Sequence, residues 1–210
     1  MKIIRRPDSA PPAVEALIRR FTVAERWIHR GTAALLGITM ITAAFLYIPL
    51  LAELSGRRDL LVTVHKWAGI TSLIPLAAGL FSRAFRMDLA RLNRFGPYDR
   101  GWLRGTLRRR DHPSGKFNAG QKMFAALTGG AILVMTGTGL IMWFPRLTPL
   151  VTRTGATFVH DWGALLFGVA VIGHIWMASN DPEARRGLRT GFVSRAWAKR
   201  HHALWERPDE

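Results

Sequence analysis

The sequence predicts an all-α integral membrane protein, built as a four-helix bundle in one domain over residues 1–210. The chain is 49% hydrophobic yet carries a formal net charge of +16, a combination that is unusual in a soluble domain. The charge is also unevenly distributed, because uncharged runs of about 20 residues separate the basic segments. Runs of that length can cross the hydrocarbon core of a bilayer. The chain has no cysteine, which excludes disulfides within it.

The N-terminal part is expected to be a polar extension followed by the first membrane helix. Residues 1–20 contain three prolines and no apolar stretch of the kind found in a signal peptide. A helix over about 22–48 follows from the uncharged run Gly31–Ala52, and Pro49 would end it. A second helix over about 59–82 is interrupted only by His65 and Lys66, and Pro75 predicts a kink within it.

The second half predicts two further membrane helices, over about 118–144 and 153–179, from the uncharged runs 123–145 and 162–180. Residues 83–117 are expected to form a long loop, rich in Arg, Gly and Pro, with a short helix around 102–109. Long loops of this kind usually bind something. Residues 180–210 form a tail with a short helical stretch near 194–201.

The distribution of Lys and Arg predicts the orientation. Residues 1–30 hold seven, residues 83–116 hold ten and the tail holds seven, whereas the loops 49–64 and 144–159 hold two each. The sequence therefore predicts a multi-pass protein of the bacterial inner membrane. Under the positive-inside rule, both of its termini and the 83–117 loop face the cytoplasm. The basic excess then reflects topology and contact with anionic lipid rather than binding of nucleic acid.

Four histidines fall in or at the ends of the predicted helices: His29, His65, His160 and His174. His160 and His174 are 14 residues apart, so they face the same side of one helix at a separation of roughly 21 Å. The predicted topology pairs the four by depth, with His29 and His174 near the cytoplasm and His65 and His160 near the periplasm. Ionisable residues within membrane spans are costly and usually functional.

Two imidazoles at each level suit the two axial positions of haem iron, which predicts two b-type haems. Zinc would need more protein ligands at each level, and a chain without cysteine cannot attach haem covalently through thioethers. The alternative is that the histidines only form hydrogen bonds between helices. Glycines in the spans fit either a flat cofactor or close helix packing. His112, His201 and His202 are expected at the surface.

A second group of polar residues lies at the start of the third membrane helix. Asn118 could cap that helix. Its amide, with that of Gln121 and the free helical N–H groups, could instead bind a carbonyl oxygen of a quinone. On spacing alone, the helix cap is the better interpretation.

Three segments carry a resemblance to a known family: Gly-Lys-Phe-Asn-Ala-Gly-Gln-Lys-Met at 115–123, His160 and His174 with Ile-Trp-Met-Ala following, and Val-Ser-Arg-Ala-Trp-Ala-Lys-Arg-His-His at 193–202. With them, the chain from about Phe21 onward resembles the cytochrome b (gamma) subunit of respiratory formate dehydrogenases. The resemblance implies axial ligation of two haems b by the four paired histidines. It also implies a site for menaquinone or ubiquinone at positions matching Asn118, Gly120, Gln121 and His174.

The resemblance also implies partners. They are an iron–sulfur beta subunit and a molybdenum or tungsten alpha subunit that oxidises formate, so this chain has no catalytic residue for formate itself. Electrons would enter at the His65/His160 level and reduce a quinone near Asn118 and Gln121. The rival expectations are a cytochrome b subunit of a nickel–iron hydrogenase or related oxidoreductase, and a membrane anchor without redox function. A transporter is disfavoured because the chain has no inverted repeat.

Overall fold

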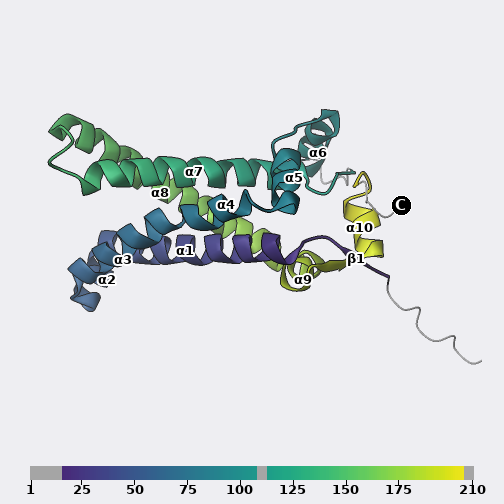
Figure 1. Cartoon of the computed structure of the whole chain (residues 1–210), viewed down its shortest axis with the longest axis horizontal. Coiled ribbons are helices and arrows are strands. Elements are labelled where there is room, and N and C mark those ends of the chain that lie inside the picture. Colours follow the sequence, from purple (N-terminus) through teal and green to yellow (C-terminus); the bar gives the residue numbers. More distant parts are fainter. Residues whose placement is uncertain (1–15, 108–112, 206–210) are drawn as a thin grey trace, which may run out of the picture.

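Four long apolar helices dominate the structure, a computed structural model that describes residues 16–107 and 113–205 (Figure 1). They are α1 (Val23–Tyr47), the consecutive pair α3 (Arg58–Thr71) and α4 (Leu73–Gly79), α7 (Ala119–Trp143) and α8 (Leu150–Ser179). Each is at least 22 residues long, which is sufficient to cross a membrane. The predicted fold class, an all-α membrane bundle of four helices, is confirmed.

The second of these helices is broken at Ser72, three residues before Pro75. Proline lacks an N–H, and its ring collides with the carbonyl four residues earlier, which here belongs to Thr71. The Ser72 N–H donates to the carbonyls of Ala68 (3.1 Å) and Gly69 (3.3 Å), and its hydroxyl donates to Gly69 O at 2.6 Å. These bonds satisfy the backbone at the interruption, which lies close to the kink predicted from Pro75.

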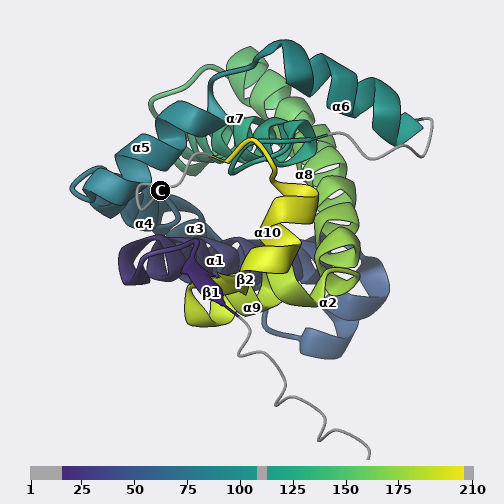
Figure 2. The same cartoon turned by 90° about the vertical axis from the view of Figure 1, so that its right-hand side faces the viewer.

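The helices associate as two pairs (Figure 2). Helix α1 packs along α3 and α4, while α7 packs along α8. The pairs meet between α3 and α7, where Trp67 and Trp143 form an edge-to-face contact with ring centroids 5.6 Å apart. One end of the bundle carries α2 (Pro49–Ser55) and the α7–α8 connection; it is called the turn end below.

The opposite end, called the layered end, is covered by short elements. These are α5 (Arg83–Leu92), α6 (Pro97–Leu107), α9 (Pro182–Thr190), α10 (Arg195–His201), and the antiparallel strands β1 (Leu17–Arg19) and β2 (Phe192–Ser194). The expectation of a long loop over 83–117 was therefore wrong, since two helices occupy most of it. The short helix expected at 102–109 is α6, which begins earlier; positions 108 and 109 lie outside the described residues.

A small core holds the layered end together. Val193 and Ala198 are fully buried beside Trp205, and Ile18 packs against them. His202, expected at the surface, is instead 2% exposed, and His112 lies outside the described residues. The Nδ1 atom of His202 is 2.7 Å from Gly115 O. Burial, reinforced by the positive charge of Arg20, lowers the pKa of His202 to about 3, so the ring is neutral.

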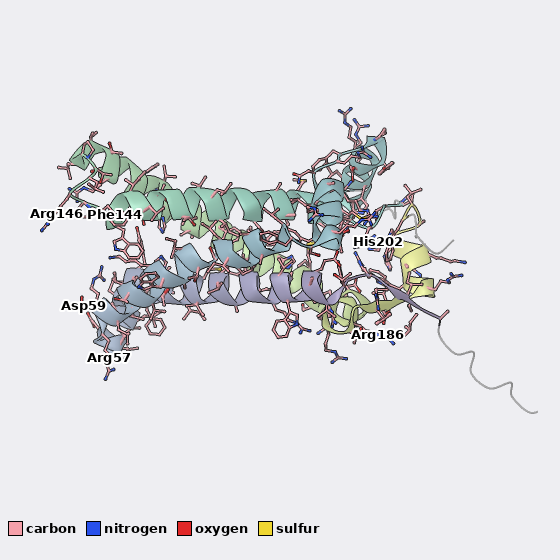
Figure 3. All side chains as sticks on the ribbon, in the orientation of Figure 1. Arg57, Asp59, Phe144, Arg146, Arg186 and His202 are labelled. Atoms are coloured by element: carbon pink, nitrogen blue, oxygen red, sulfur yellow. The ribbon has the colours of Figure 1, made fainter. Side chains whose placement is uncertain are left out.

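The outer surface of the long helices is apolar. Leu133, Leu166 and Ile172 are 66–68% exposed, as expected for side chains that face lipid. Charged side chains lie at the two ends instead, including Arg57 and Arg146 at the turn end (Figure 3). The arrangement is that of a multi-pass membrane protein.

Candidate functional site

His65 on α3 and His160 on α8 lie together in the half of the bundle nearer the turn end. Their ring centroids are 6.1 Å apart and their planes are inclined at 67°. An imidazole–metal bond is about 2 Å long, so two rings on opposite sides of one metal ion have centroids roughly 6 Å apart. The separation of the two rings therefore matches that of a pair of axial ligands.

Threonine hydroxyls orient both rings in the same way. Thr42 Oγ1 lies 2.9 Å from His65 Nδ1, and Thr138 Oγ1 lies 2.9 Å from His160 Nδ1. Each hydroxyl donates its own proton to a helix carbonyl four residues earlier, at 2.7 Å in both cases. Each must therefore accept from the imidazole, which assigns the ring proton to Nδ1. Nε2 of both rings is left with its lone pair available for a metal.

The carbonyl of Thr39 strengthens this assignment for His65. It lies 3.1 Å from His65 Nδ1, and a carbonyl can only accept. Fixing the tautomer of a metal-binding imidazole through its other nitrogen is the usual role of such a partner. Thr42 and Thr138 were not among the residues predicted from the sequence. Their signal was a threonine within an apolar helix at the depth of a histidine.

His29 on α1 and His174 on α8 lie toward the layered end, but among the described residues their rings do not form a close pair like that of His65 and His160. His29 is exposed and His174 half-buried. The ring of His174 stacks on that of Phe124 from α7, with centroids 4.2 Å apart and parallel planes. Phe124 was also missed, because its partner is 50 residues away in the sequence.

The glycines of the spans differ in the space beside them. A Cβ at Gly79 would come within 2.7 Å of Phe85, and one at Gly163 within 3.0 Å of Met135 Sδ, so both positions permit close packing. A Cβ at Gly37, Gly129 or Gly137 would have no other heavy atom within 4 Å. Those three positions have open space beside the helices.

The residues of the described chain offer two imidazoles at each level and no larger ligand set. No group of three or more His, Cys, Asp or Glu side chains is placed to hold a metal among residues 16–107 and 113–205. A zinc site would require such a group, whereas haem iron requires two axial ligands. The donor set therefore fits haem.

Asn118 and Gln121 form a reciprocal cap at the start of α7. Asn118 Oδ1 accepts from Gln121 N at 2.9 Å, and Gln121 Oε1 accepts from Asn118 N at 3.0 Å. This agrees with the helix-cap interpretation. Because the oxygen of each amide is occupied, each NH₂ group points away from the cap. Within the described residues neither NH₂ donates a hydrogen bond, so both can donate to a ligand.

The other positions in this group contribute through packing. A Cβ at Gly120 would lie 3.1 Å from the ring of Trp102 on α6, so glycine here admits that ring against α7. Gln121 and Phe124 are three residues apart and share one face of the helix. That face therefore leads from the free amide of Gln121 to the stacked rings of Phe124 and His174.

Comparison with known proteins gives one family match and several curated relatives. The family model described as prokaryotic cytochrome b561 matches residues 20–187. The nitrate-inducible formate dehydrogenase cytochrome b556(Fdn) subunit of Escherichia coli is 34% identical over 99 residues, which is 46% of each chain. The formate dehydrogenase cytochrome b556 subunit of Haemophilus influenzae is 27% identical over 184 residues, covering 82% of this chain and 75% of the relative.

A third relative covers more of the sequence. The formate dehydrogenase cytochrome b556(fdo) subunit of Escherichia coli is 25% identical over 205 residues, covering 90% of this chain and 92% of the relative. The match to the nitrate-inducible relative spans less than half of that protein.

Proposed function

The chain belongs to the prokaryotic cytochrome b561 family, and from that membership we propose that it is the membrane cytochrome b subunit of a formate dehydrogenase complex. The names of the three relatives support this assignment. In this proposal the chain carries electrons and reduces quinone, while formate itself is oxidised on another subunit.

The proposal assigns two haem groups to the four histidines. His65 and His160 would hold one, and His29 and His174 the other. When bound, the two haems would supply one-electron carriers at two depths of the membrane. The observation that carries the proposal is the close pair of His65 and His160, with ring centroids 6.1 Å apart and both Nδ1 atoms engaged by threonines. Hydrogen bonding of this kind makes the imidazole a stronger ligand.

The quinone would bind at the layered end, beside the start of α7. The free NH₂ groups of Asn118 and Gln121 would donate to a quinone carbonyl. Phe124, on the same face of α7 as Gln121, stacks on His174 of α8 and so connects this site to that histidine. Gly120 admits Trp102 against this segment, which would exclude water from one side of the ligand. Menaquinone and ubiquinone both present such carbonyls.

Orientation and partners complete the proposal. The basic residues cluster at the layered end, which would place that end and both termini in the cytoplasm of an inner-membrane protein. The turn end would then face the periplasm and receive electrons from an iron–sulfur beta subunit. That subunit would be fed by a molybdenum- or tungsten-containing alpha subunit.

The haem assignment predicts the effect of removing one ligand. A His160→Ala variant should insert normally but contain one haem per chain where the wild type contains two, because a single imidazole at that level cannot hold a six-coordinate iron. A pyridine haemochrome assay and the reduced-minus-oxidised spectrum of the purified chain measure this.

The matched control is His201→Ala, which removes an exposed histidine of the layered end and should retain both haems. Two full haem equivalents in His160→Ala would disprove the ligand assignment. A wild-type protein without haem absorbance would instead indicate a membrane anchor without redox function.

A further inference from the structure

Three charged side chains from separate parts of the chain meet inside the layered end. Lys116 Nζ pairs with Asp88 Oδ2 of α5 and lies 3.4 Å from Glu25 Oε1 of α1. Their side chains are only 6–7% exposed. Buried charges are costly unless paired, and here two carboxyl groups share one ammonium group. The three residues are called the carboxyl cluster below.

The remaining oxygens of the carboxyl cluster are also engaged. Glu25 Oε2 accepts from the backbone N–H of Thr22 at 2.6 Å and from its hydroxyl at 2.7 Å. Asp88 Oδ1 accepts from Arg91 at 2.9 Å, and the Arg91 side chain is 38% exposed. Asp88 therefore has one oxygen toward the interior and one toward a residue in contact with water.

Other charges face Asp88 as well. Its carboxyl interacts directly with that of Glu25, and the guanidinium of Arg20 acts on it from the segment before α1. Burial and the contact with Glu25 raise the pKa of Asp88 to about 6, although Lys116 opposes the rise. A group with a pKa near the operating pH can both accept and release a proton.

The carboxyl cluster adjoins both sites of the proposed function. Lys116 precedes Asn118 by two residues, so their Cα atoms are at most about 7.6 Å apart. Glu25 precedes His29 by four residues, which places the two on one face of α1. The cluster thus connects the water-contacting Arg91, through Asp88, to Lys116, which stands two residues before Asn118.

A neighbouring ion pair, Lys122 with Asp99, differs from the carboxyl cluster in having one carboxylate for its ammonium group. Lys122 Nζ contacts both oxygens of Asp99, at 2.8 and 2.9 Å, and the carbonyl of Arg94 at 2.8 Å. One ammonium there meets one carboxylate, whereas two carboxyl groups share the ammonium of Lys116. Lys122 and Asp99 are therefore a structural pair.

We propose, resting on the quinone-reducing function above, that Asp88 supplies protons from the cytoplasm to the quinone, with Glu25 and Lys116 positioning it. Reduction of the quinone requires two electrons from the iron–sulfur donor and two protons. For each proton, the O–H bond of Asp88 breaks and an O–H bond forms on one of the two quinone oxygens, so that each oxygen receives one proton. The Asp88 carboxylate is then reprotonated from water at the Arg91 side.

The test is the quinone half-reaction in membrane vesicles that contain the chain with its partner subunits. The pre-reduced protein is mixed with a short-chain naphthoquinone, and haem reoxidation is followed between pH 5 and 8. In the wild type the rate should fall as the pH rises through about 6, because Asp88 must be protonated to donate. Asp88→Asn should be at least about tenfold slower at pH 6 and lack this pH dependence.

Asp99→Asn is the matched control, since it removes a buried carboxylate paired to a lysine at the same end. It should keep the wild-type pH profile. Asp88→Glu should restore most of the rate, as a proton donor would and a purely structural residue would not. Asp88→Asn is expected to fold, because Lys116 keeps Glu25 as a partner.

A second readout does not depend on bound cofactor. The infrared band of protonated carboxyl groups should show a component that titrates near pH 6 in the wild type and is absent from Asp88→Asn. If the wild type has no such component, or if Asp88→Asn reoxidises with wild-type rate and pH profile, Asp88 is not the proton donor. Absence of quinone reduction by the wild type would overturn the proposed function, and this proposal with it.

Discussion

At the scale of single residues, the arrangement of His65 and His160 repeats one device twice. In both cases the hydroxyl of a threonine on the neighbouring helix donates a hydrogen bond to a carbonyl of its own helix. The same hydroxyl accepts a hydrogen bond from the Nδ1–H of a histidine. A hydroxyl that merely filled space would not need to lie 2.9 Å from a ring nitrogen in both pairs. The repeated geometry is best explained by the need to hold two rings with their Nε2 atoms free.

This device predicts the effect of losing the hydroxyl. Thr138→Val keeps the shape of the side chain but leaves His160 Nδ1 without its acceptor, so the ring becomes a weaker ligand and its orientation is less fixed. Haem affinity at that level should fall by about tenfold or more. The midpoint potential of that haem should become more positive, because a less basic ligand stabilises oxidised iron less.

Spectroelectrochemical titration measures the midpoint potential. Thr128→Val is the control, because Thr128 bonds back to Phe124 O on the same helix at 2.8 Å and, within the described residues, makes no hydrogen bond to a histidine. If Thr138→Val and Thr128→Val have the same potentials and haem content, the hydrogen bond to His160 has no role in ligation.

The positions of the four histidines could be predicted from the sequence, because depth in a membrane follows from helix length and charge alone. The partners of the rings could not. Thr42, Thr138 and Phe124 reach their histidines across helix interfaces, and which faces meet depends on the packing of the whole bundle. Asp88 was hidden for the same reason, since its burial depends on α1 and the segment before α7.

At the scale of helices and strands, the sequence contains local start and stop signals for the short helices, but a hydropathy pattern does not include them. Helix α9 is capped by Asp181, whose side chain accepts from Ala184 N at 2.9 Å. Pro182 then occupies the first turn. It ends at Gly191, which adopts φ 94°. These are standard start and stop signals for a helix. The strands carry no such signal, because Leu17–Arg19 pair with residues about 175 positions away.

Gly191 provides a test of the layered end. Its left-handed conformation is strained for any other residue, and a Cβ there would lie 2.7 Å from Phe21 O. Gly191→Ala should therefore destabilise the layered end by about 2 kcal/mol or more. Hydrogen exchange of the amides of α9 and β2 should accelerate at least about tenfold.

Gly115→Ala is the comparison, because a Cβ there would have no other heavy atom within 4 Å and exchange should change little. Equal protection of α9 and β2 in the two variants would show that the turn at Gly191 does not limit stability.

At the scale of the whole molecule, the two ends of the bundle differ in charge and in construction. Among residues 16–107 and 113–205, the turn end has short connections with few basic residues, whereas the layered end has four short helices, a strand pair and most of the Lys and Arg. This asymmetry could be predicted from the sequence, because the number of Lys and Arg residues in a connecting segment does not depend on tertiary contacts. It did not predict that those segments fold into a layer.

The absence of cysteine from the sequence makes the proposed orientation directly measurable. Leu147 at the turn end is 79% exposed and Leu204 at the layered end is 45% exposed. In intact spheroplasts, a membrane-impermeant maleimide should label Leu147→Cys but label Leu204→Cys only after permeabilisation. The opposite pattern would place the layered end in the periplasm and reverse the proposed direction of electron flow.

The pairing of β1 with β2 also determines when the layered end can form during synthesis. Strand β1 leaves the ribosome before any membrane helix, yet its partner is made only after the last helix is complete. The first strand must therefore wait, unpaired, through the insertion of all four helices. Until then the layered end lacks its strand pair. The layered end can be completed only when the residues of β2 emerge.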